Sequence, residues 1–164
     1  MGPEGIRTYL AELGIDVAWF DHEPVFTCEE SAKLPAMPGA DTKNLFLAEE
    51  KGPRRFLVVV GHETRADLKA LRALLGVKQL QFGSAEDLQA MLGVTPGSVT
   101  LLGLACDRER RVEVVIDEPL WAAPYLRCHP LTNAASVVIA HADVERFLAA
   151  TGHQPRVLSV PCRS

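Results

Sequence analysis

A lysine and an asparagine, Lys43 and Asn44, stand near the start of an apolar run that is typical of a buried strand. The run covers residues 42–47, and a second apolar run, residues 56–60, follows it. Removing an ammonium group from water is costly, so a lysine at the mouth of a buried strand either extends its amine into solvent or binds an electronegative group. The sequence leaves both interpretations open, and the second makes Lys43 a candidate for chemistry.

A glycine-rich segment is the second candidate. Residues 93–103 contain three glycines and one proline. Glycine lets a ligand approach the backbone closely and leaves N–H groups available as donors. An ordinary connection between a helix and a strand is the alternative interpretation of this segment.

A third candidate is a group of polar side chains just before an apolar run at 137–140. His129, Thr132, Asn133 and Ser136 place several hydrogen-bonding groups within eight residues. Binding sites for small molecules usually combine an apolar pocket with a few such groups. A capped turn, in which Asn133 bonds its own backbone and His129 is structural, is the alternative.

Composition excludes several functional classes. The chain has 164 residues, of which 48% are hydrophobic and 23% are charged, and this fits one globular domain over residues 1–164. The net charge of −4 argues against a protein that coats DNA or RNA, although a local basic patch could still hold one end of an RNA. No apolar stretch approaches the ~20 residues of a membrane helix. The first residues lack a signal pattern, so we expect a cytosolic protein without membrane association.

The chain also lacks the spacing of familiar metal and catalytic motifs. None of the four cysteines belongs to a Cys-x-x-Cys pair, and His62-Glu63 has Ala66 where a zinc-protease helix needs a second histidine. Ser98 is not part of a Gly-x-Ser-x-Gly turn, and no phosphate-binding loop or dinucleotide fingerprint is present. We therefore predict neither a metal nor a cofactor.

The elements that must position these residues follow from apolar periodicity, caps and breakers. The predicted helices cover residues 6–13, 27–34, 67–75, 84–92 and a segment around 144–148, and the predicted strands cover 17–21, 42–47, 56–60, 80–82, 112–116, 135–140 and 156–160. Hairpin-like strand pairs mix with helices, without a regular alternation of strand and helix. This order predicts an α+β fold with a mixed sheet.

One face of the helix predicted at 67–75 is basic. Arg65, Lys69 and Arg72 share this face, and Lys78 lies close by in the sequence. Such a face either holds one end of an RNA or is an ordinary solvated surface, and the sequence favours neither.

The three candidate segments together resemble the YbaK-like family, which includes the insertion (editing) domain of bacterial prolyl-tRNA synthetase. The similarity extends from residues 25–27 through 42–47, 93–100 and 129–133 to 152–155. It is strongest to the free-standing branch of the family, the prolyl-tRNA editing proteins. The resemblance implies a single α+β domain with a curved mixed sheet flanked by helices.

The resemblance also assigns site residues. It implies that Lys43 is the family's catalytic lysine, with Asn44 beside it. The family's substrate loop, Gly-x-x-x-Pro, corresponds to residues 97–101, where Leu101 replaces the proline. The family's His-Pro-x-x-Asn-Thr-Ala-Thr stretch corresponds to residues 129–136.

That last stretch departs from the family pattern at two positions. Ala134 lacks one hydroxyl group and Ser136 has a shorter side chain than threonine. The candidate catalytic residues are Lys43, Asn44, Gly97, Ser98 and His129, and the candidate substrate-binding residues are Leu101, Thr132, Asn133 and Ser136. We expect that the activity is kept and that these departures bear on which amino acid is preferred.

The implied function is hydrolysis of the ester bond of mischarged tRNA(Pro), above all alanyl-tRNA(Pro). The implied partners are the acceptor end of this tRNA, for whose stem the basic helix face is the candidate contact, and prolyl-tRNA synthetase. Three alternatives stay open: a deacylase for another small amino acid such as Cys, Ser or Thr, a non-catalytic RNA-binding or regulatory module, and an enzyme that acts on another small ester or amide. If the substrate is mischarged tRNA(Pro), Lys43 anchors its terminal nucleotide, and backbone N–H groups around Gly97 and Ser98 hold the carbonyl of the aminoacyl ester.

Overall fold

The computed structural model describes residues 1–23 and 39–163. The helices are α1 (Gly2–Glu12), α3 (Leu68–Leu75), α4 (Ala85–Leu92), α5 (Glu118–Trp121) and α6 (His141–Thr151), with 3-10 turns η1 (Pro96–Ser98) and η2 (Leu101–Cys106). The strands are β1 (Ala18–Asp21), β2 (Thr42–Glu49), β3 (Arg55–Gly61), β4 (Leu80–Phe82), β5 (Val112–Asp117), β6 (Tyr125–Cys128), β7 (Ala135–Ala140) and β8 (Arg156–Leu158). None of the helices in the described residues has the length and apolar character needed to cross a membrane.

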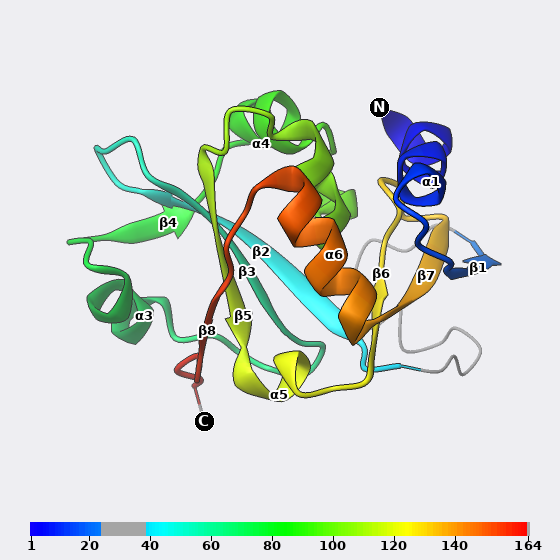
Figure 1. Ribbon diagram of the computed structural model, residues 1–164. Helices are drawn as coiled ribbons and strands as arrows, with labels where there is room; N and C mark the ends of the chain where they lie inside the picture. Colours follow the sequence, from blue (N-terminus) through cyan, green and yellow to red (C-terminus); the bar gives the residue numbers. More distant parts are fainter. Residues whose placement is uncertain (24–38, 164) are drawn as a thin grey trace.

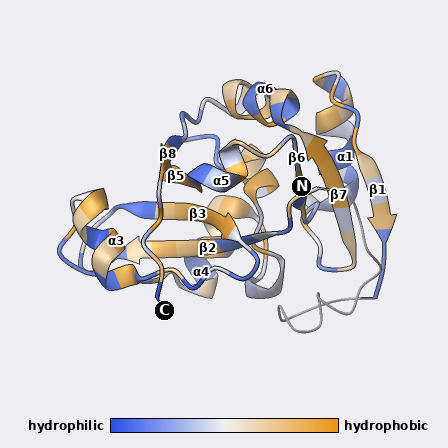
Figure 2. Cartoon of the chain, turned by 90° about the horizontal axis from the view of Figure 1, so that it is seen from below, coloured by the Kyte–Doolittle hydropathy of each residue, from blue (hydrophilic) through white to orange (hydrophobic). Residues whose placement is uncertain are grey.

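A five-stranded mixed sheet forms the centre of the structure, with the strand order β4-β2-β3-β5-β8 (Figure 1). Successive side chains of a strand point to opposite faces, so the buried strands feed two separate hydrophobic clusters. Leu47 packs with Leu71 of α3 on one face. Its neighbour Phe46 packs on the other face, in the cluster that contains Phe147 of α6. Figure 2 shows the interior strands β2, β3 and β7 mainly in hydrophobic colours.

A second, three-stranded antiparallel sheet has the order β1-β7-β6. Val137 and Ile139 of β7 turn inward and join the cluster of Phe46 and Phe147. The two sheets meet at Ala40, which pairs with Leu126 of β6 just before β2 begins. This bridge brings the end of β6 next to the start of β2, where the candidate lysine lies.

The structure confirms the α+β class with a mixed arrangement of strands, although the strands divide into two bridged sheets. The helix predicted at 27–34 lies outside the described residues. Four elements had no sequence prediction: α5, β6, η1 and η2. The strand β6 escapes notice because it has four residues and lies between Pro124 and Pro130, which are typical strand breakers.

A buried pair, Asp107 and His153, fixes the end of α6 to the start of β5. The Oδ2 atom of Asp107 lies 2.9 Å from Nε2 of His153, and each side chain is 2% exposed. The same carboxylate accepts hydrogen bonds from the backbone N–H groups of Arg111 and Val112. Because a buried charge is costly unless it is paired, the fold depends on this contact more than on its surface ion pairs.

We predict that Asp107→Ala lowers the free energy of unfolding by about 3–5 kcal/mol, since it leaves His153 buried without its partner. The matched control is Glu145→Ala, which removes the carboxylate of the exposed pair with His141 and should cost no more than about 1 kcal/mol. Urea unfolding of both variants gives the two values. Equal losses of unfolding free energy in the two variants would mean that the buried Asp107 pair stabilises the fold no more than an exposed pair does.

Candidate functional site

The alternation of β2 decides where the candidate lysine points. Lys43 pairs across the sheet with Val60, and both lie on the face that α3 covers. The Lys43 side chain is half-buried, and its Nζ donates a hydrogen bond to the backbone carbonyl of Thr64, in the loop after β3. This contact keeps the amine at the mouth of the strand, beside the residues that lead into α3.

Lys43 opens into a cavity of about 730 Å³ between the edge of the sheet and the start of α3. The residues that line it are Lys43, Leu45, Arg65, Ala66, Asp67, Leu68, Lys69, Phe82 and Arg163. Four of these side chains are basic, and one, Asp67, is a carboxylate. The Asp67 carboxylate caps α3 by accepting a hydrogen bond from the N–H of Ala70. The cavity is therefore strongly cationic, although the chain as a whole has a net charge of −4.

A polar cluster lies beside Lys43 on the same side of the bridged sheets. Asp41, two residues before Lys43, places Oδ2 3.2 Å from Nδ1 of His62 and 3.4 Å from Nη2 of Arg127. The hydroxyl of Thr42 also donates to the backbone carbonyl of Arg127, at 2.6 Å. These bonds fix the end of β6, and hence His129, relative to the start of β2.

His129 is held by its own turn. Its Nδ1 lies 3.0 Å from the carbonyl oxygen of Ala135, and its ring stands 6.4 Å from the ring of His22, centroid to centroid. Burial lowers the pKa of His129 below its ordinary value of 6.5, and nearby His22 lowers it further. The bond to Ala135 and the charge of Asp41 act in the opposite direction. His129 is thus a neutral imidazole at pH 7.

The rest of the predicted polar group lies in the same turn and at the start of β7. Ser136 is buried, and its Oγ lies 2.9 Å from Nε2 of His22. The Thr132 hydroxyl accepts a hydrogen bond from the N–H of Ala134, so Thr132 and not Asn133 caps this turn, and Asn133 is half-buried. Leu131, just before Thr132, has a φ of 61°, a left-handed value that is uncommon for leucine and marks a tight turn.

Asn44 points the other way from Lys43. It pairs with Val59, whose side chain belongs to the cluster of Phe46 and Phe147. Within the described part of the chain, Oδ1 of Asn44 is buried and has no hydrogen-bond partner. An unsatisfied buried acceptor is costly, so this oxygen is a candidate acceptor for a donor group of a ligand.

The glycine-rich loop belongs to the Asn44 side of the sheet. The turn η2 follows it and is buried in the same cluster, with Leu101 only 1% exposed. The N–H of Ser98 donates to the carbonyl of Thr95 at 2.9 Å. The described lining of the Lys43 cavity includes neither Gly97 nor Ser98. The structure thus separates the predicted lysine and loop between two faces, and Leu101 lies inside the core.

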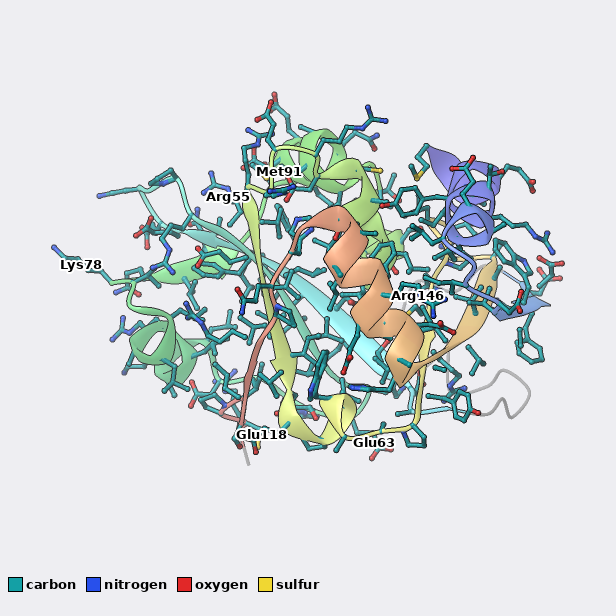
Figure 3. The ribbon with its side chains drawn as sticks, viewed as in Figure 1. Arg55, Glu63, Lys78, Met91, Glu118 and Arg146 are labelled. Atoms are coloured by element: carbon teal, nitrogen blue, oxygen red, sulfur yellow. The ribbon has the colours of Figure 1, made fainter. Side chains whose placement is uncertain are left out.

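The predicted basic helix face divides as well. Arg65 and Lys69 line the cavity with Lys43, whereas Arg72 and Lys78 do not. Arg72 donates to the backbone carbonyl of Lys78 at 3.1 Å, and the Lys78 side chain projects away from the body of the molecule (Figure 3). Only the first half of this face is placed to share a ligand with Lys43.

Cys128 does not combine with His129 in a metal site. Its side chain faces the core, and burial raises the pKa of its thiol to about 12, so the thiol stays protonated at neutral pH. Among the residues that the structure describes, no three His, Cys, Asp or Glu side chains are grouped closely enough to hold a metal ion.

Sequence reasoning missed four residues of this region: Asp41, His22, Phe82 and Arg163. Asp41 precedes Lys43 by two residues, so strand alternation could have placed it on the same face. The other three come from distant segments, and only the pairing of the strands brings them near.

The comparisons with known proteins identify the family. The family model described as the aminoacyl-tRNA editing domain matches residues 22–147. The chain belongs to this family. Prolyl-tRNA editing protein ProX of Acetoanaerobium sticklandii is 37% identical over 152 residues, which cover 92% of both chains. Prolyl-tRNA synthetase associated domain-containing protein 1 of Danio rerio is 38% identical over 157 residues, covering 94% of this chain and 85% of its own.

A solved structure, of a candidate trans-editing enzyme for prolyl-tRNA synthetase, superposes with a TM-score of 0.70. The superposition covers 99% of this chain and 97% of the chain in that structure. At 22% sequence identity, this similarity shows the fold alone. The family assignment makes this aminoacyl-tRNA editing domain a hydrolase of the aminoacyl-tRNA ester bond.

The lowered pKa of His129 predicts how the stability of the fold depends on pH. The folded state resists protonation of this ring, while the unfolded chain protonates near pH 6.5. The unfolded state then binds more protons in the window below 6.5, so stability should fall as the pH is lowered through it. In urea unfolding between pH 5 and 8, the free energy of unfolding should fall more steeply with decreasing pH for the wild type than for His129→Gln. Parallel curves would contradict this assignment.

Proposed function

We propose that this editing domain is a trans-editing deacylase that hydrolyses mischarged tRNA(Pro), with alanyl-tRNA(Pro) as its main substrate. The observation that supports it most is the amine of Lys43, which opens into a cationic cavity at the position of the family's catalytic lysine. The names of the relatives point to prolyl-tRNA as the tRNA involved. The acceptor end of tRNA(Pro) is the proposed partner, and prolyl-tRNA synthetase supplies the mischarged substrate.

The chemistry needs no protein nucleophile. An aminoacyl ester is already activated, so water attacks its carbonyl carbon, the bond to the ribose oxygen breaks, and a proton from the water goes to that oxygen. The protein must orient the ester, stabilise the negative charge that develops on the carbonyl oxygen, and admit one water. The hydroxyl of the terminal adenosine can take part in the proton transfer.

In this proposal Lys43 binds the phosphate or ester of the terminal nucleotide. Its amine donates to the Thr64 carbonyl while no RNA is present, so it is kept in place and satisfied before the substrate arrives. The neutral ring of His129, with Thr132, Asn133 and Ser136 around it, lines the part that receives the amino acid or the water. Asn44 lies on the opposite face of β2, so its unpartnered oxygen would act as an acceptor on the side of the main core and not within the Lys43 cavity.

The loop around Gly97 and Ser98 has a narrower part in this proposal than the sequence suggested. The Ser98 N–H already donates to Thr95, so it is free to hold a carbonyl only if the loop rearranges. Leu101, buried beneath the loop, would act through the position of the backbone and not by touching the substrate.

Selectivity for alanine would come from size. A charging enzyme discriminates poorly against a smaller amino acid, since one missing methylene is worth only ~1–3 kcal/mol. A second pocket that admits alanine and excludes proline resolves this. The decisive experiment incubates the protein with tRNA(Pro) carrying alanine, cysteine, serine, threonine or proline and follows the loss of ester. Fastest loss of alanine supports the proposal, and preference for another residue assigns the enzyme to that amino acid instead.

We predict that Lys43→Ala lowers the deacylation rate at least about 100-fold, because a cation that stabilises the reacting ester is lost. The measurement is single-turnover hydrolysis of alanyl-tRNA(Pro), with an unfolding curve to show that the variant is folded. The matched control is Lys51→Asn. Lys51 lies in the turn between β2 and β3 with a φ of 59°, a value that asparagine tolerates. Undiminished hydrolysis by folded Lys43→Ala would contradict the role of the lysine.

We also predict that the activity is unchanged after dialysis against EDTA, because positioning and charge suffice to hydrolyse an activated ester. Hydrolysis before and after treatment is the measurement. Loss of activity that zinc restores would mean that the site includes metal ligands not recognised in the sequence.

A further inference from the structure

Phe82 is an aromatic side chain in an unusual place. It ends the short edge strand β4 and is 65% exposed, yet it lines the cavity that Lys43 opens into. Four other large hydrophobic side chains in the described residues are exposed, namely Met1, Leu74, Tyr125 and Val157, and none of them lines this cavity. An aromatic face left in water beside a binding cavity is available for stacking.

The register of the sheet places Phe82 and Lys43 on one surface. Phe82 pairs with Leu47 of β2, and Leu47, Leu45 and Lys43 alternate along the same face. Four residues of strand separate Lys43 from Leu47, which is roughly 13 Å along β2. A single nucleobase is too small to touch both ends, so Phe82 is placed for a group that lies some distance from the one at Lys43.

The cavity also has cations that no acidic side chain neutralises. Lys43, Arg65, Lys69 and Arg163 form no ion pair with any residue in 1–23 or 39–163. Arg163 comes from a segment remote in sequence and is fixed by its backbone, because its N–H donates to the carbonyl of Arg65 at 2.7 Å and its neighbour Cys162 pairs with Ala66. These backbone contacts hold Arg65 and Arg163 at the same edge of the cavity.

Several free cations around an exposed aromatic ring match one class of ligand. A single-stranded nucleic acid offers phosphates to the cations and an unpaired base to the ring, and such strands are bound through these two contacts. The bases of a duplex are stacked on one another and cannot stack on Phe82. A simple anion would use the cations but not the ring.

We propose that this cavity binds the unpaired 3′ end of the RNA, with Phe82 stacked on a base upstream of the terminal adenosine and Arg65, Lys69 and Arg163 on the neighbouring phosphates. The proposal rests on the proposed function only for the identity of the RNA. The strand enters over β4, passes along the cavity and delivers its last nucleotide to Lys43. Phe82 and Arg163 are therefore binding residues that act at a distance from the ester.

The test uses a short single-stranded RNA that ends in CCA and has no amino acid, with a fluorophore at its 5′ end. Anisotropy titrations give the Kd. Phe82→Ala should weaken binding roughly 5- to 100-fold, the range found when a stacked aromatic is removed. Phe82→Trp should keep the affinity, because it retains a stacking surface. The matched control is Leu74→Ala, which removes another exposed apolar side chain outside the cavity and should leave the Kd unchanged.

Arg163→Ala tests the phosphate contact separately. It should reduce the slope of log K against log salt by about 0.7, the value for one phosphate contact of a single strand. An unchanged Kd in Phe82→Ala, together with an unchanged salt slope in Arg163→Ala, would overturn the proposal. Equal binding of a blunt RNA duplex, with the same sensitivity to Phe82→Ala, would also overturn it.

The outcome can be separated from that of the proposed function. Hydrolysis of a minimal alanyl-adenosine by the wild type reports on the ester chemistry alone, because this substrate does not extend to β4. If the protein hydrolyses no aminoacyl-tRNA but binds the RNA probe through Phe82, the proposed deacylation fails and this binding site stands. If the protein deacylates aminoacyl-tRNA but Phe82→Ala binds the probe as well as the wild type does, the proposed deacylation stands and this binding site fails.

Discussion

The strict two-residue period of β2 is the constraint on which the site depends. Adjacent polar residues in a strand cannot point to the same side, so Lys43 and Asn44 serve two different surfaces. Lys43 faces α3 and a cationic cavity, while Asn44 faces the main core with a buried oxygen that has no partner among the described residues. A shift of one residue in the register with β3 would exchange them and bury an ammonium group in the cluster of Phe46.

The register is protected by interactions on both sides of the lysine. Toward the C-terminal end of β2, Leu47 is fully buried against α3. Before the strand, Asp41 contacts His62 and Arg127, and Ala40 pairs with Leu126. These contacts join the loop after β3 and the end of β6 to the same short segment. The lysine and the histidine turn are therefore tied to the same short segment of backbone, which suits a site that works by positioning.

The sequence predicted most elements that have a clear period or cap, and it predicted the candidate lysine and histidine. The cap of α4 by Ser84 and the left-handed Gly93 at its end are two such cases, since both signals are local. What it could not predict depends on pairing between distant segments. Phe82 joins the site only because β4 pairs with β2, and Arg163 joins only through its backbone bond to Arg65.

The same limit explains why the predicted site had to be divided. The motifs around Lys43, Gly97 and His129 were grouped by family resemblance, which gives no direction for a side chain. Alternation and burial supply those directions, and they place Leu101 in the core and leave Lys78 outside the cavity. They also indicate a division of tasks along β2. In the proposed function, its first residues would meet the ester, and Phe82, opposite Leu47, would meet the RNA that brings it. Because these two regions are about 13 Å apart on one strand, the proposal implies that affinity for the RNA and selection of the amino acid can be changed independently of each other.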